Sequence, residues 1–468
     1  MDESPPRRRT TRSGNEAFDP GPVTVGIDIG TTSVKAVACN AEGTPVRRIR
    51  LPHELRIPSA NRLEHDADSA WRRRVLAALD DVGSDLDVRG VCVAAMVPSA
   101  CAVDHVGAAL APALLYGDER GRAEAGKSPI DSGEFAGFVA DLASRHPDAA
   151  GFWPAQAVAN HALSGRAVID TATALTTMPL FDGTGWNDDA CASAGIEARR
   201  LPALVPGTEP AGVVHPELVG GAQVPLSGGA IDGFAELLVS AAEEPGEVIV
   251  VVGATLLTWA VQPGWVEVPS LWTIPHVRAD RCLVGGPSSA GGLFHDRVRN
   301  LLGIAAGEER AQRGMRAHLP VWLPYIRGER TPLHDASLRA SLHGLDLTHG
   351  PAEVLRAAHE ATGFAIRHHL DLAGVTPTRI VISGGGADDS GLVRAIADAV
   401  GVPVAIPHHR NGAARGAAFI ARVTAGLEAR PEDAVRWAGV TREVEPNPRW
   451  TSSTAERYGV YRSLIPDR

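Results

Sequence analysis

The chain has 468 residues, 44% hydrophobic and 21% charged, a balance that excludes wholesale disorder and fibrous architectures. This length suits two domains of roughly 200 residues each. The formal net charge of −10 gives no positive field that would attract nucleic acid or anionic lipid. No apolar run approaches the roughly 20 residues of a membrane span, so we expect neither nucleic acid nor a membrane as a partner. Five scattered cysteines without a CxxC pair indicate reduced thiols and a cytoplasmic location.

The N-terminal part of the chain begins with polar, proline-rich and basic residues, which predict a disordered leader over residues 1–20. Val23 to Asp28 is then a β-branched run that ends in an acidic residue. The turn-forming Gly30-Thr31-Thr32 and a second apolar stretch, Val34 to Cys39, follow it. This order predicts two antiparallel strands joined by a tight turn, with Pro45 to Leu51 as a third strand.

A second hairpin of the same kind is predicted far downstream. Glu247 to Val252 is apolar and leads into Gly253-Ala254-Thr255, after which Leu256 to Val261 resumes a strand. Both hairpins carry glycine and hydroxyl residues at the turn, as expected if two related domains each present a turn to one polyphosphate. The repeat indicates the duplicated α/β layout of actin-like ATPases.

The stretch from Pro202 to Gly229 is rich in glycine and proline, which indicates an inter-domain connection with its boundary near Ser227. Further along, Arg379 to Ile382 predicts a buried strand, Ser383 to Asp389 a glycine-rich turn, and Leu392 to Val400 a helix. Strand, glycine turn and helix together suit a bound nucleotide.

The first turn contains residues that suit a phosphate and a metal ion. Backbone N–H groups and hydroxyls at Gly30-Thr31-Thr32 can hold phosphate oxygens, and Asp28 can hold Mg²⁺ directly or through water. The alternative is an ordinary hairpin turn. Lys35 points either to phosphate or to solvent, and the sequence leaves both open.

Asp232 lies in the segment SGGAIDG, at the expected start of a helix. A carboxylate at that place is half explained by helix capping. Phosphoryl transfer to a hydroxyl, however, needs a carboxylate that orients the alcohol and accepts its proton. Gly384-Gly385-Gly386-Ala387 could let a nucleotide lie against bare backbone, although a triple glycine alone is more often a loop.

The order of these segments resembles the FGGY carbohydrate kinases, and xylulose kinases in particular, over residues 23 to about 425. The segments that carry the resemblance, in chain order, are GIDIGTTSVKA, Thr171 to Ile196, GGAIDGFAE, VVGATLLTWAV, SSAGG, LPYIRGERTPLHD, SLHGLDLTHGPAEVLRAAHEA, ISGGGADDSGLVRAIADAVGVPV and GAARGAAFIA. The resemblance implies two ribonuclease H-like domains around a central cleft. We expect an N-terminal domain over residues 21–226, a C-terminal domain over 227–445 and a tail over 446–468.

The resemblance also implies roles for individual residues. Asp232 matches the catalytic base and Asp28 the Mg²⁺ support. The residues expected to line the nucleotide and its phosphates are Gly30, Thr31, Thr32, Lys35, Gly253, Thr255, Gly291, Gly385, Gly386 and Ala387. The residues expected near the sugar, besides Asp232, are Met96, Asp118 and Arg120. For these three the alternatives are a core position for Met96 and a surface ion pair for the other two.

Three departures from the family pattern bear on substrate and activity. Xylulose kinases usually have Gln-Met-His near the sugar, whereas this chain has Ala95-Met96-Val97-Pro98, so an imidazole donor is missing. Ala254 takes the place of a hydroxyl residue in the second turn. Between Gly126 and Ala155 the usual Lys-x-x-Trp helix is not recognisable.

The adjacent Glu329 and Arg330 are interpreted as a structural pair rather than as catalytic residues.

The leading hypothesis is an ATP- and Mg²⁺-dependent kinase that phosphorylates a hydroxyl of a small sugar, most plausibly a ketopentose such as xylulose or ribulose. The alternatives are a polyol kinase and a catalytically weak sugar- or nucleotide-binding regulatory protein of the same fold. ATP and the sugar are the expected partners, and dimerisation stays open.

Overall fold

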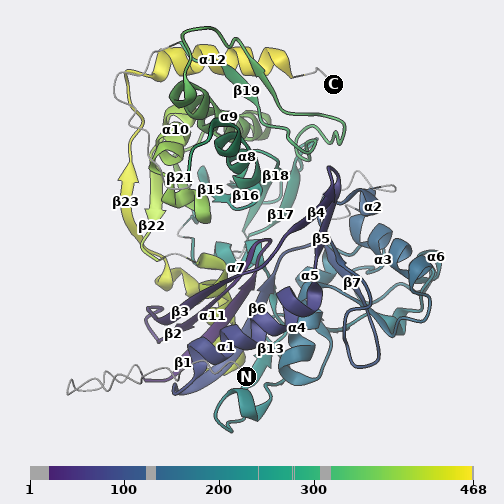
Figure 1. Cartoon of the computed structure of the whole chain (residues 1–468). Helices are drawn as coiled ribbons and strands as arrows, with labels where there is room; N and C mark the ends of the chain where they lie inside the picture. Colours follow the sequence, from purple (N-terminus) through teal and green to yellow (C-terminus); the bar gives the residue numbers. More distant parts are fainter. Residues whose placement is uncertain are drawn as a thin grey trace, which may run out of the picture.

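The computed structural model describes residues 21–122, 133–240, 242–276, 278, 280–305, 318–409 and 411–465. The leader expected over residues 1–20 lies outside the described residues. Figure 1 shows two α/β domains one above the other, with the N-terminal part of the chain in purple and blue below and most of the C-terminal part in green and yellow above. Across the described part of the chain, no helix is both long and apolar enough to cross a bilayer. All five cysteines are buried and unpaired with one another.

The first domain is built on a seven-stranded sheet in the order β12-β13-β6-β1-β2-β3, with β14 also paired to β6. Its strands are β1 (Val23–Ile29), β2 (Ser33–Cys39), β3 (Pro45–Pro52), β6 (Val88–Ala95), β12 (Pro210–Val213), β13 (Pro225–Ser227) and β14 (Ala230–Ile231). Strands β1, β2 and β3 pair antiparallel, so the predicted opening meander is confirmed. The glycine- and proline-rich segment over residues 202–229 also contributes β12 and β13 to this sheet, as strands too short to leave a clear periodic signal in the sequence.

Smaller elements surround this sheet. The helices are η1 (Asp68–Arg73), α1 (Arg74–Gly83), α2 (Glu119–Arg122), α3 (Glu134–Arg145), α4 (Ala155–Ser164), α5 (Thr171–Leu175), α6 (Asp188–Ser193), η2 (Ala198–Arg200) and η3 (Pro216–Leu218). The strands are β4 (Arg56–Ser59), β5 (Arg62–His65), β7 (Ser99–Val103), β8 (Ala113–Leu115), β9 (Gly151–Trp153), β10 (Val168–Asp170) and β11 (Ala203–Val205). The region without a recognisable Lys-x-x-Trp helix therefore contains α3 and β9, and its residues 126–132 lie outside the described residues.

The second domain has a seven-stranded sheet in the order β17-β18-β16-β15-β21-β22-β23. Its strands are β15 (Glu247–Val252), β16 (Leu256–Pro263), β17 (Trp272–Pro275), β18 (Arg281–Ser288), β21 (Arg379–Ser383), β22 (Val404–Pro407) and β23 (Val440–Val444), with β19 (Val321–Leu323) and β20 (Ser341–His343) apart from them. The helices are α7 (Asp232–Leu238), α8 (Gly292–Leu302), α9 (Pro351–Ala373), η4 (Gly385–Asp388), α10 (Ser390–Val400), α11 (Gly412–Thr424), η5 (Pro431–Trp437) and α12 (Thr451–Leu464).

The two sheets share one topology. In the first, β3, β2 and β1 pair antiparallel, while β1, β6 and β13 are parallel. In the second, β18, β16 and β15 pair antiparallel, while β15, β21 and β22 are parallel. The repeat expected from the two hairpins is therefore present at the level of whole sheets, which confirms the duplicated actin-like fold.

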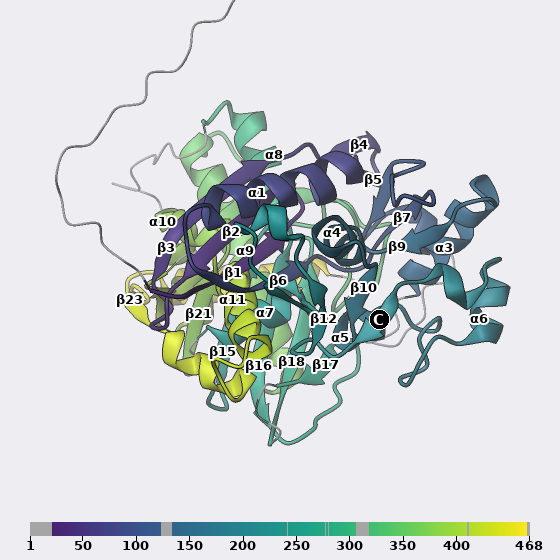
Figure 2. The ribbon, with the colours of Figure 1, turned by 90° about the horizontal axis from the view of Figure 1, so that it is seen from below.

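Helices α7 and α11 join the domains. Although α11 comes late in the chain, it packs against β1 and β6 of the first sheet. Glycines permit this close contact, since a Cβ on Gly26 would lie 1.9 Å from the Ala414 carbonyl oxygen and one on Gly90 would lie 2.6 Å from that of Ala421. Figure 2 shows α1 and α11 on opposite sides of β1 and β2. Gly26 on β1 and Gly90 on β6 therefore allow α11 to pack directly against the backbone of both strands.

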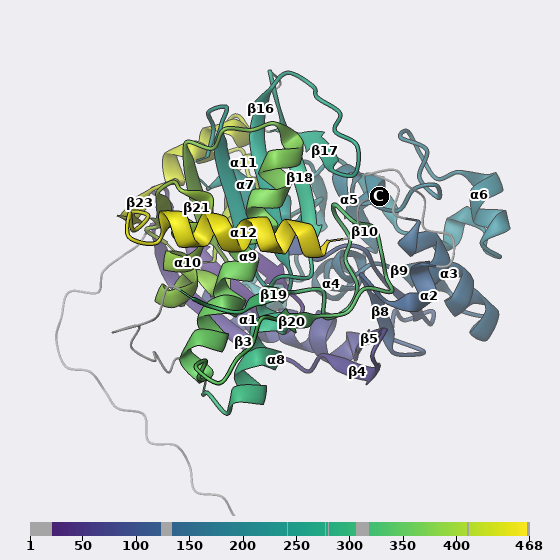
Figure 3. The same ribbon diagram turned by 90° about the horizontal axis from the view of Figure 1, so that it is seen from above.

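Helix α7 lies between the two sheets. Its Ala235 packs with Cys92 and Ala94 of β6, and Leu237 packs with Ile249 of β15. At the far end of the second domain, α12 lies across α9 and α10 (Figure 3). The residues assigned to a tail thus include a helix whose Tyr461 is buried in the second domain.

Candidate active site

Asp28 reaches the junction between the domains because of strand alternation. Val23, Val25, Ile27 and Ile29 point into the core under α1, so every other residue of β1 faces α11 and α7. On that face the Thr24 hydroxyl donates to the Ala418 carbonyl, and the Asp28 side chain is 5% exposed. The sequence pattern therefore places a buried carboxylate beneath α7.

Lys35 pairs with this carboxylate. It lies directly opposite Asp28 in the β1–β2 register, and its Nζ is 3.0 Å from Asp28 Oδ2. The charge of Asp28, the largest influence, raises the pKa of Lys35 above its usual value. Of the two orientations left open by the sequence, the structure shows Lys35 directed to Asp28.

Asp232 is the first residue of α7 and is half-buried. Its Oδ1 accepts a hydrogen bond of 2.7 Å from the backbone N–H of Gly233, so one oxygen does resemble a helix cap. Burial, followed by the nearby charge of Asp28, raises the pKa of Asp232 to about 7, against the opposing influence of Gly233 and Lys35. A carboxylate with this pKa can take up a proton near neutral pH.

Glu236 lies one helical turn beyond Asp232 and was missed by sequence reasoning. Its Oε2 accepts a hydrogen bond of 2.6 Å from the backbone N–H of Ala413 at the start of α11. A Cβ on Gly412 would lie 2.1 Å from Oε1, so this contact depends on a glycine. The signal was available, since residues four apart on a helix share a face. Glu236 therefore ties the helix of Asp232 to the helix that packs on Asp28's strand.

The first turn, over residues 30–32, is held from behind by side chains. His65 accepts from Trp71 Nε1 at Nδ1 (3.0 Å), so its Nε2 carries the proton and donates to the Thr31 carbonyl (2.8 Å). Burial lowers the pKa of His65 to about 3, which keeps this neutral form. His53 Nε2 donates to the Gly30 carbonyl at 3.1 Å. Two imidazoles thus hold the carbonyl groups of Gly30 and Thr31.

The Thr31 side chain has a partner of its own. Its Oγ1 lies 2.6 Å from the Tyr116 hydroxyl, and Tyr116 was not singled out in the sequence. Thr32, by contrast, is exposed. The two hydroxyl residues of the turn are therefore in different environments.

The second turn, over residues 253–255, is held by backbone. The N–H groups of Gly292 and Leu293 donate to the carbonyls of Gly253 (2.8 Å) and Ala254 (3.0 Å). A Cβ on Gly291 would lie 2.2 Å from the carbonyl carbon of Thr255, so the start of α8 sits directly on the turn. Gly291 therefore faces the turn, and its role here is close packing.

The residues of the glycine-rich η4 turn that were predicted to face the nucleotide lie in different environments: some pack against the core, and one borders open space. A Cβ on Gly386 would lie 2.5 Å from Val252 Cβ, and the Ala387 side chain is buried in the core of the second domain. A Cβ on Gly385 would meet nothing within 4 Å. Of these three residues, only Gly385 has room beside it for a ligand.

The three residues expected near the sugar have other contacts. Met96 belongs to the core of the first domain. The fully buried Asp118 accepts from the Leu63 N–H (2.7 Å) and from Arg120 Nε (2.8 Å), and Arg120 Nη2 also donates to Glu64 (2.8 Å). Asp118 and Arg120 thus form a buried network rather than a surface pair, and a sugar contact for them stays a prediction.

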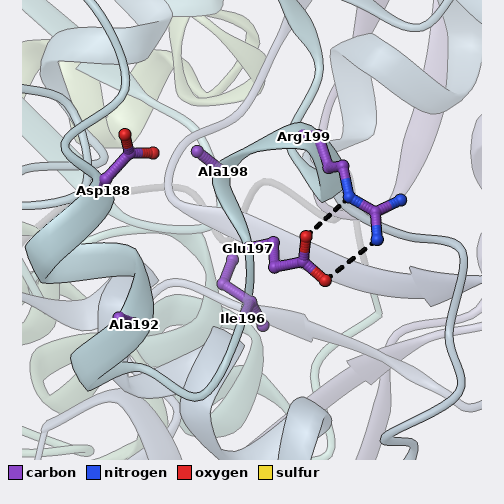
Figure 4. Close-up of a pocket in the computed structure, with 6 residues that line it drawn as sticks. All are labelled: Asp188, Ala192, Ile196, Glu197, Ala198 and Arg199. Carbon is purple, nitrogen blue, oxygen red and sulfur yellow. Dashed lines mark hydrogen bonds and ion pairs between the residues drawn. The ribbon is translucent and has the colours of Figure 1, made fainter.

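A shallow depression elsewhere lacks this chemistry. It is lined by Asp188, Ala192, Ile196, Glu197, Ala198 and Arg199. Figure 4 shows the ion pair between the exposed Glu197 and Arg199 side chains at its edge. Helix α6, which carries Asp188, lies at the periphery of the first domain in Figures 1 and 2, away from α7. The carboxylates around α7 are therefore the better candidate site.

Comparison with known proteins bears directly on this site. A family model described as "FGGY family of carbohydrate kinases, N-terminal domain" matches residues 23–128, and the corresponding C-terminal domain model matches residues 287–425. Together they cover just over half of the chain. The chain belongs to the FGGY family of carbohydrate kinases. This family assignment, which the sequence motifs predicted, also makes the chain a carbohydrate kinase.

The similar kinases differ in substrate. The chain is 26% identical to a xylulose kinase of Escherichia coli (strain K12), over 87% of this chain and 90% of that one. It is 23% identical to a gluconokinase of Bacillus subtilis (strain 168), with coverage of 86% and 87%, and 25% identical to a glycerol kinase of Methylobacterium nodulans, with coverage of 87% and 90%. A solved "xyloylose kinase" from Brucella ovis has the same fold, with a TM-score of 0.78, 23% identity and coverage of 95% of this chain and 99% of that chain.

Proposed function

We propose that this carbohydrate kinase transfers the γ-phosphate of ATP to a hydroxyl of a small sugar, with a ketopentose such as xylulose or ribulose as the preferred acceptor. The observation that carries the proposal is the carboxylate of Asp232, which lies half-buried at the start of α7 and whose pKa is raised to about 7 by burial and, second, by the charge of Asp28. A site that only bound sugar would have no need of such a group.

Asp232 is proposed as the general base. Its Oδ1 is occupied by the Gly233 N–H, which leaves Oδ2 to accept the proton of the sugar hydroxyl. The hydroxyl oxygen then forms the new bond to the γ-phosphorus, while the bond from that phosphorus to the β–γ bridging oxygen of ATP breaks and ADP leaves. The proton on Asp232 is afterwards released to solvent.

The phosphates of ATP are assigned to the two turns. We infer that backbone N–H groups and hydroxyls at Gly30, Thr31 and Thr32 approach them from the first domain, and those at Gly253 and Thr255 from the second. Gly385, with open space beside it, suits the remainder of the nucleotide. Lys35 acts through Asp28, since its ammonium group already pairs with that carboxylate.

The residues present fit a magnesium ion. Asp28 pairs with the Lys35 ammonium group at 3.0 Å, and the charges of Asp28, Glu236 and Asp232 all raise the pKa of Lys35, so three carboxylates act on this one ammonium group. Oxygen ligands of this kind suit Mg²⁺, and Asp28 is the residue proposed to hold it. When bound, the ion would neutralise charge on the phosphate oxygens.

The choice of a ketopentose rests on the recurrence of xylulose kinases among the similar proteins. The gluconokinase and glycerol kinase relatives keep gluconate and polyols as alternatives. Ala254, which replaces a hydroxyl residue in the second turn, keeps open a catalytically weak, regulatory member of the family.

The test is sugar-dependent ATP consumption across ketopentoses, aldoses, gluconate and glycerol, with the phosphorylated product identified by mass spectrometry. For the best substrate, Asp232→Asn should lower kcat by roughly 10²–10⁴ while ATP binding is nearly unchanged, because the amide keeps the shape but cannot take the proton. A wild-type rate in this variant would remove Asp232 from the mechanism. No sugar-dependent consumption in the unsubstituted chain would favour the regulatory alternative.

A further inference from the structure

A second link between the domains lies beside the first turn, apart from α7 and α11. From the second domain, Arg327 Nη2 donates to the Gly117 carbonyl of the first domain at 3.2 Å. The guanidinium of Arg330 lies over the Tyr116 ring, 5.4 Å from its centroid. The Tyr116 hydroxyl is in turn 2.6 Å from the hydroxyl of Thr31. Side-chain contacts therefore run without a break from the second domain to the turn of the first.

The second-domain end of this link is firmly held. Glu329 is buried, and its carboxylate accepts from the Ser288 hydroxyl (2.7 Å) and from the backbone N–H groups of Ser289 (2.9 Å) and Arg330 (2.8 Å). These bonds tie the backbone of Arg330 to the end of β18. The interpretation of Glu329 as structural fits this geometry, whereas its expected partner Arg330 extends to the other domain.

The first-domain end is also anchored. The N–H of Gly117, next to Tyr116, donates to the carboxylate of Glu134 on α3 at 3.2 and 3.3 Å. Tyr116 itself is only 8% exposed. On its other side, Leu115 of β8 pairs with Ser99 of β7. Because the backbone on both sides is held, the phenol ring has little freedom, and its hydroxyl position is set by the surrounding packing.

We propose that Tyr116 is a positioning residue that orients the Thr31 hydroxyl toward a phosphate oxygen of ATP. Through its contact with the Tyr116 ring, Arg330 makes this orientation depend on the position of the second domain. The inference rests on the proposed function, which assigns Thr31 to the phosphates of ATP. Neither Tyr116 nor Arg330 needs to touch the substrates.

The chemistry follows from what a hydroxyl can do. Threonine has one O–H proton to donate. If that proton went to Tyr116, none would be left for a phosphate; if Tyr116 donates to Thr31 Oγ1, the Thr31 proton is available for the anion. A cation over the ring withdraws electron density from the phenol and strengthens its O–H as a donor. Donor chains of this kind also strengthen one another.

The test is a double-mutant cycle on nucleotide affinity. Binding of the non-hydrolysable analogue AMP-PNP with Mg²⁺ is measured by calorimetry for the unsubstituted chain, Tyr116→Phe, Thr31→Val and the double variant. Each single change should weaken binding about tenfold, the usual size for one hydrogen bond that serves a charged group. The double variant should be no more than about twofold weaker than either single, because both changes remove the same chain of bonds.

Arg330→Gln should weaken binding about threefold with Tyr116 present and have no further effect in the Tyr116→Phe background. The matched control is the pair Arg367 and Tyr458 in the second domain. There the guanidinium lies 4.2 Å from the ring centroid and the hydroxyl donates to Asp371. Arg367→Gln and Tyr458→Phe should leave AMP-PNP affinity unchanged.

The outcomes distinguish failure of the positioning role of Tyr116 from failure of the proposed kinase function. Unchanged affinity in Tyr116→Phe, or full additivity with Thr31→Val, would overturn the positioning role while the proposed function stands. Complete failure of the unsubstituted, folded chain to bind AMP-PNP would overturn the proposed function, and this inference with it. The expected non-additivity, with melting temperatures of all variants within a few degrees of one another, would establish the role.

Discussion

The two turns that we assign to the phosphates of ATP have equivalent places in the duplicated fold but are supported by different means. The turn over residues 30–32 is held by the side chains of His53, His65 and Tyr116, with one further bond of 3.0 Å from the His53 backbone N–H to the Thr32 carbonyl. The turn over residues 253–255 is held by backbone N–H groups at the start of α8, with Gly291 pressed against it. We call the first turn adjustable because single side-chain substitutions can alter its support, and the second rigid because its support comes from the backbone of α8.

This difference has a consequence for mutational sensitivity. Substitutions of the side chains that support the first turn should change the orientation of a single hydroxyl or carbonyl group, and should therefore lower catalytic efficiency by moderate amounts. Changes behind the second should displace a helix start and the turn together.

Gly291→Ala should have the largest effect on activity. A Cβ there would lie 2.2 Å from the Thr255 carbonyl carbon, so either α8 or the turn must move. We expect a loss of about 1–3 kcal/mol in the free energy of unfolding and a fall of roughly a hundredfold in kcat/KM for ATP. Thermal unfolding and steady-state kinetics measure the two. Gly459→Ala, where a Cβ meets nothing within 4 Å, is the control.

Thr255→Val tests the hydroxyl of the second turn, on a side chain that is partly buried. Removing its hydroxyl should raise KM for ATP ten- to a hundredfold, corresponding to a loss of about 1.5–3 kcal/mol for one charge-assisted hydrogen bond, without a change in melting temperature. Steady-state kinetics at varied ATP give the answer. If Thr255→Val matched the wild type while Thr31→Val did not, the phosphates would be held from the first domain alone.

His65→Phe tests the adjustable turn and should lower kcat/KM only several-fold. It keeps the size of the ring but leaves the Trp71 N–H and the Thr31 carbonyl unpaired, at a cost of about 1–3 kcal/mol for each.

The same variant should change the response to acid. The pKa of His65 is lowered to about 3 by burial, so the unfolded chain binds the proton first, near pH 6.5, and stability falls as pH drops below that value. Between pH 6.5 and 5 this residue should account for about 2 kcal/mol of lost stability. In His65→Phe the loss measured by denaturant unfolding should be smaller by that amount. An equal loss in both proteins would show that His65 is not protonated on unfolding.

The local parts of this architecture could be read from the sequence. Both hairpins, the β21 strand and the glycine turn after it follow from alternation and glycine placement. Asp28 and Asp232 were singled out because each lies at the end or start of such an element, and their roles, taken from the family resemblance, stay predictions. Their burial and mutual influence agree with the chemistry assigned to them.

The parts that sequence reasoning missed depend on long-range contacts. Tyr116 reaches Thr31 across 85 residues, and Thr24 meets Ala418 across 394. No periodic pattern encodes such pairs, because each partner alone looks like an ordinary buried residue. The same holds for α11, whose alanine-rich face gives no sign that it packs on the other domain's sheet.

Ala254→Ser should have the smallest effect, and it distinguishes a working turn from a degraded one. The carbonyl of Ala254 accepts from the Leu293 N–H at 3.0 Å, so its backbone is already held by α8, and its side chain is only partly buried. If Thr255 supplies the hydroxyl of this turn, a second hydroxyl has no phosphate oxygen left to serve, and kcat/KM for ATP should stay within about twofold of wild type. If the turn has instead lost its phosphate contact, serine should restore a hydrogen bond and raise kcat/KM at least about tenfold. We expect the first result, because the strands that flank the turn and the start of α8 are fully paired around it. A large rise in kcat/KM for ATP in Ala254→Ser, together with an unchanged value in Thr255→Val, would mean that the turn over residues 253–255 has lost its contact with the phosphates.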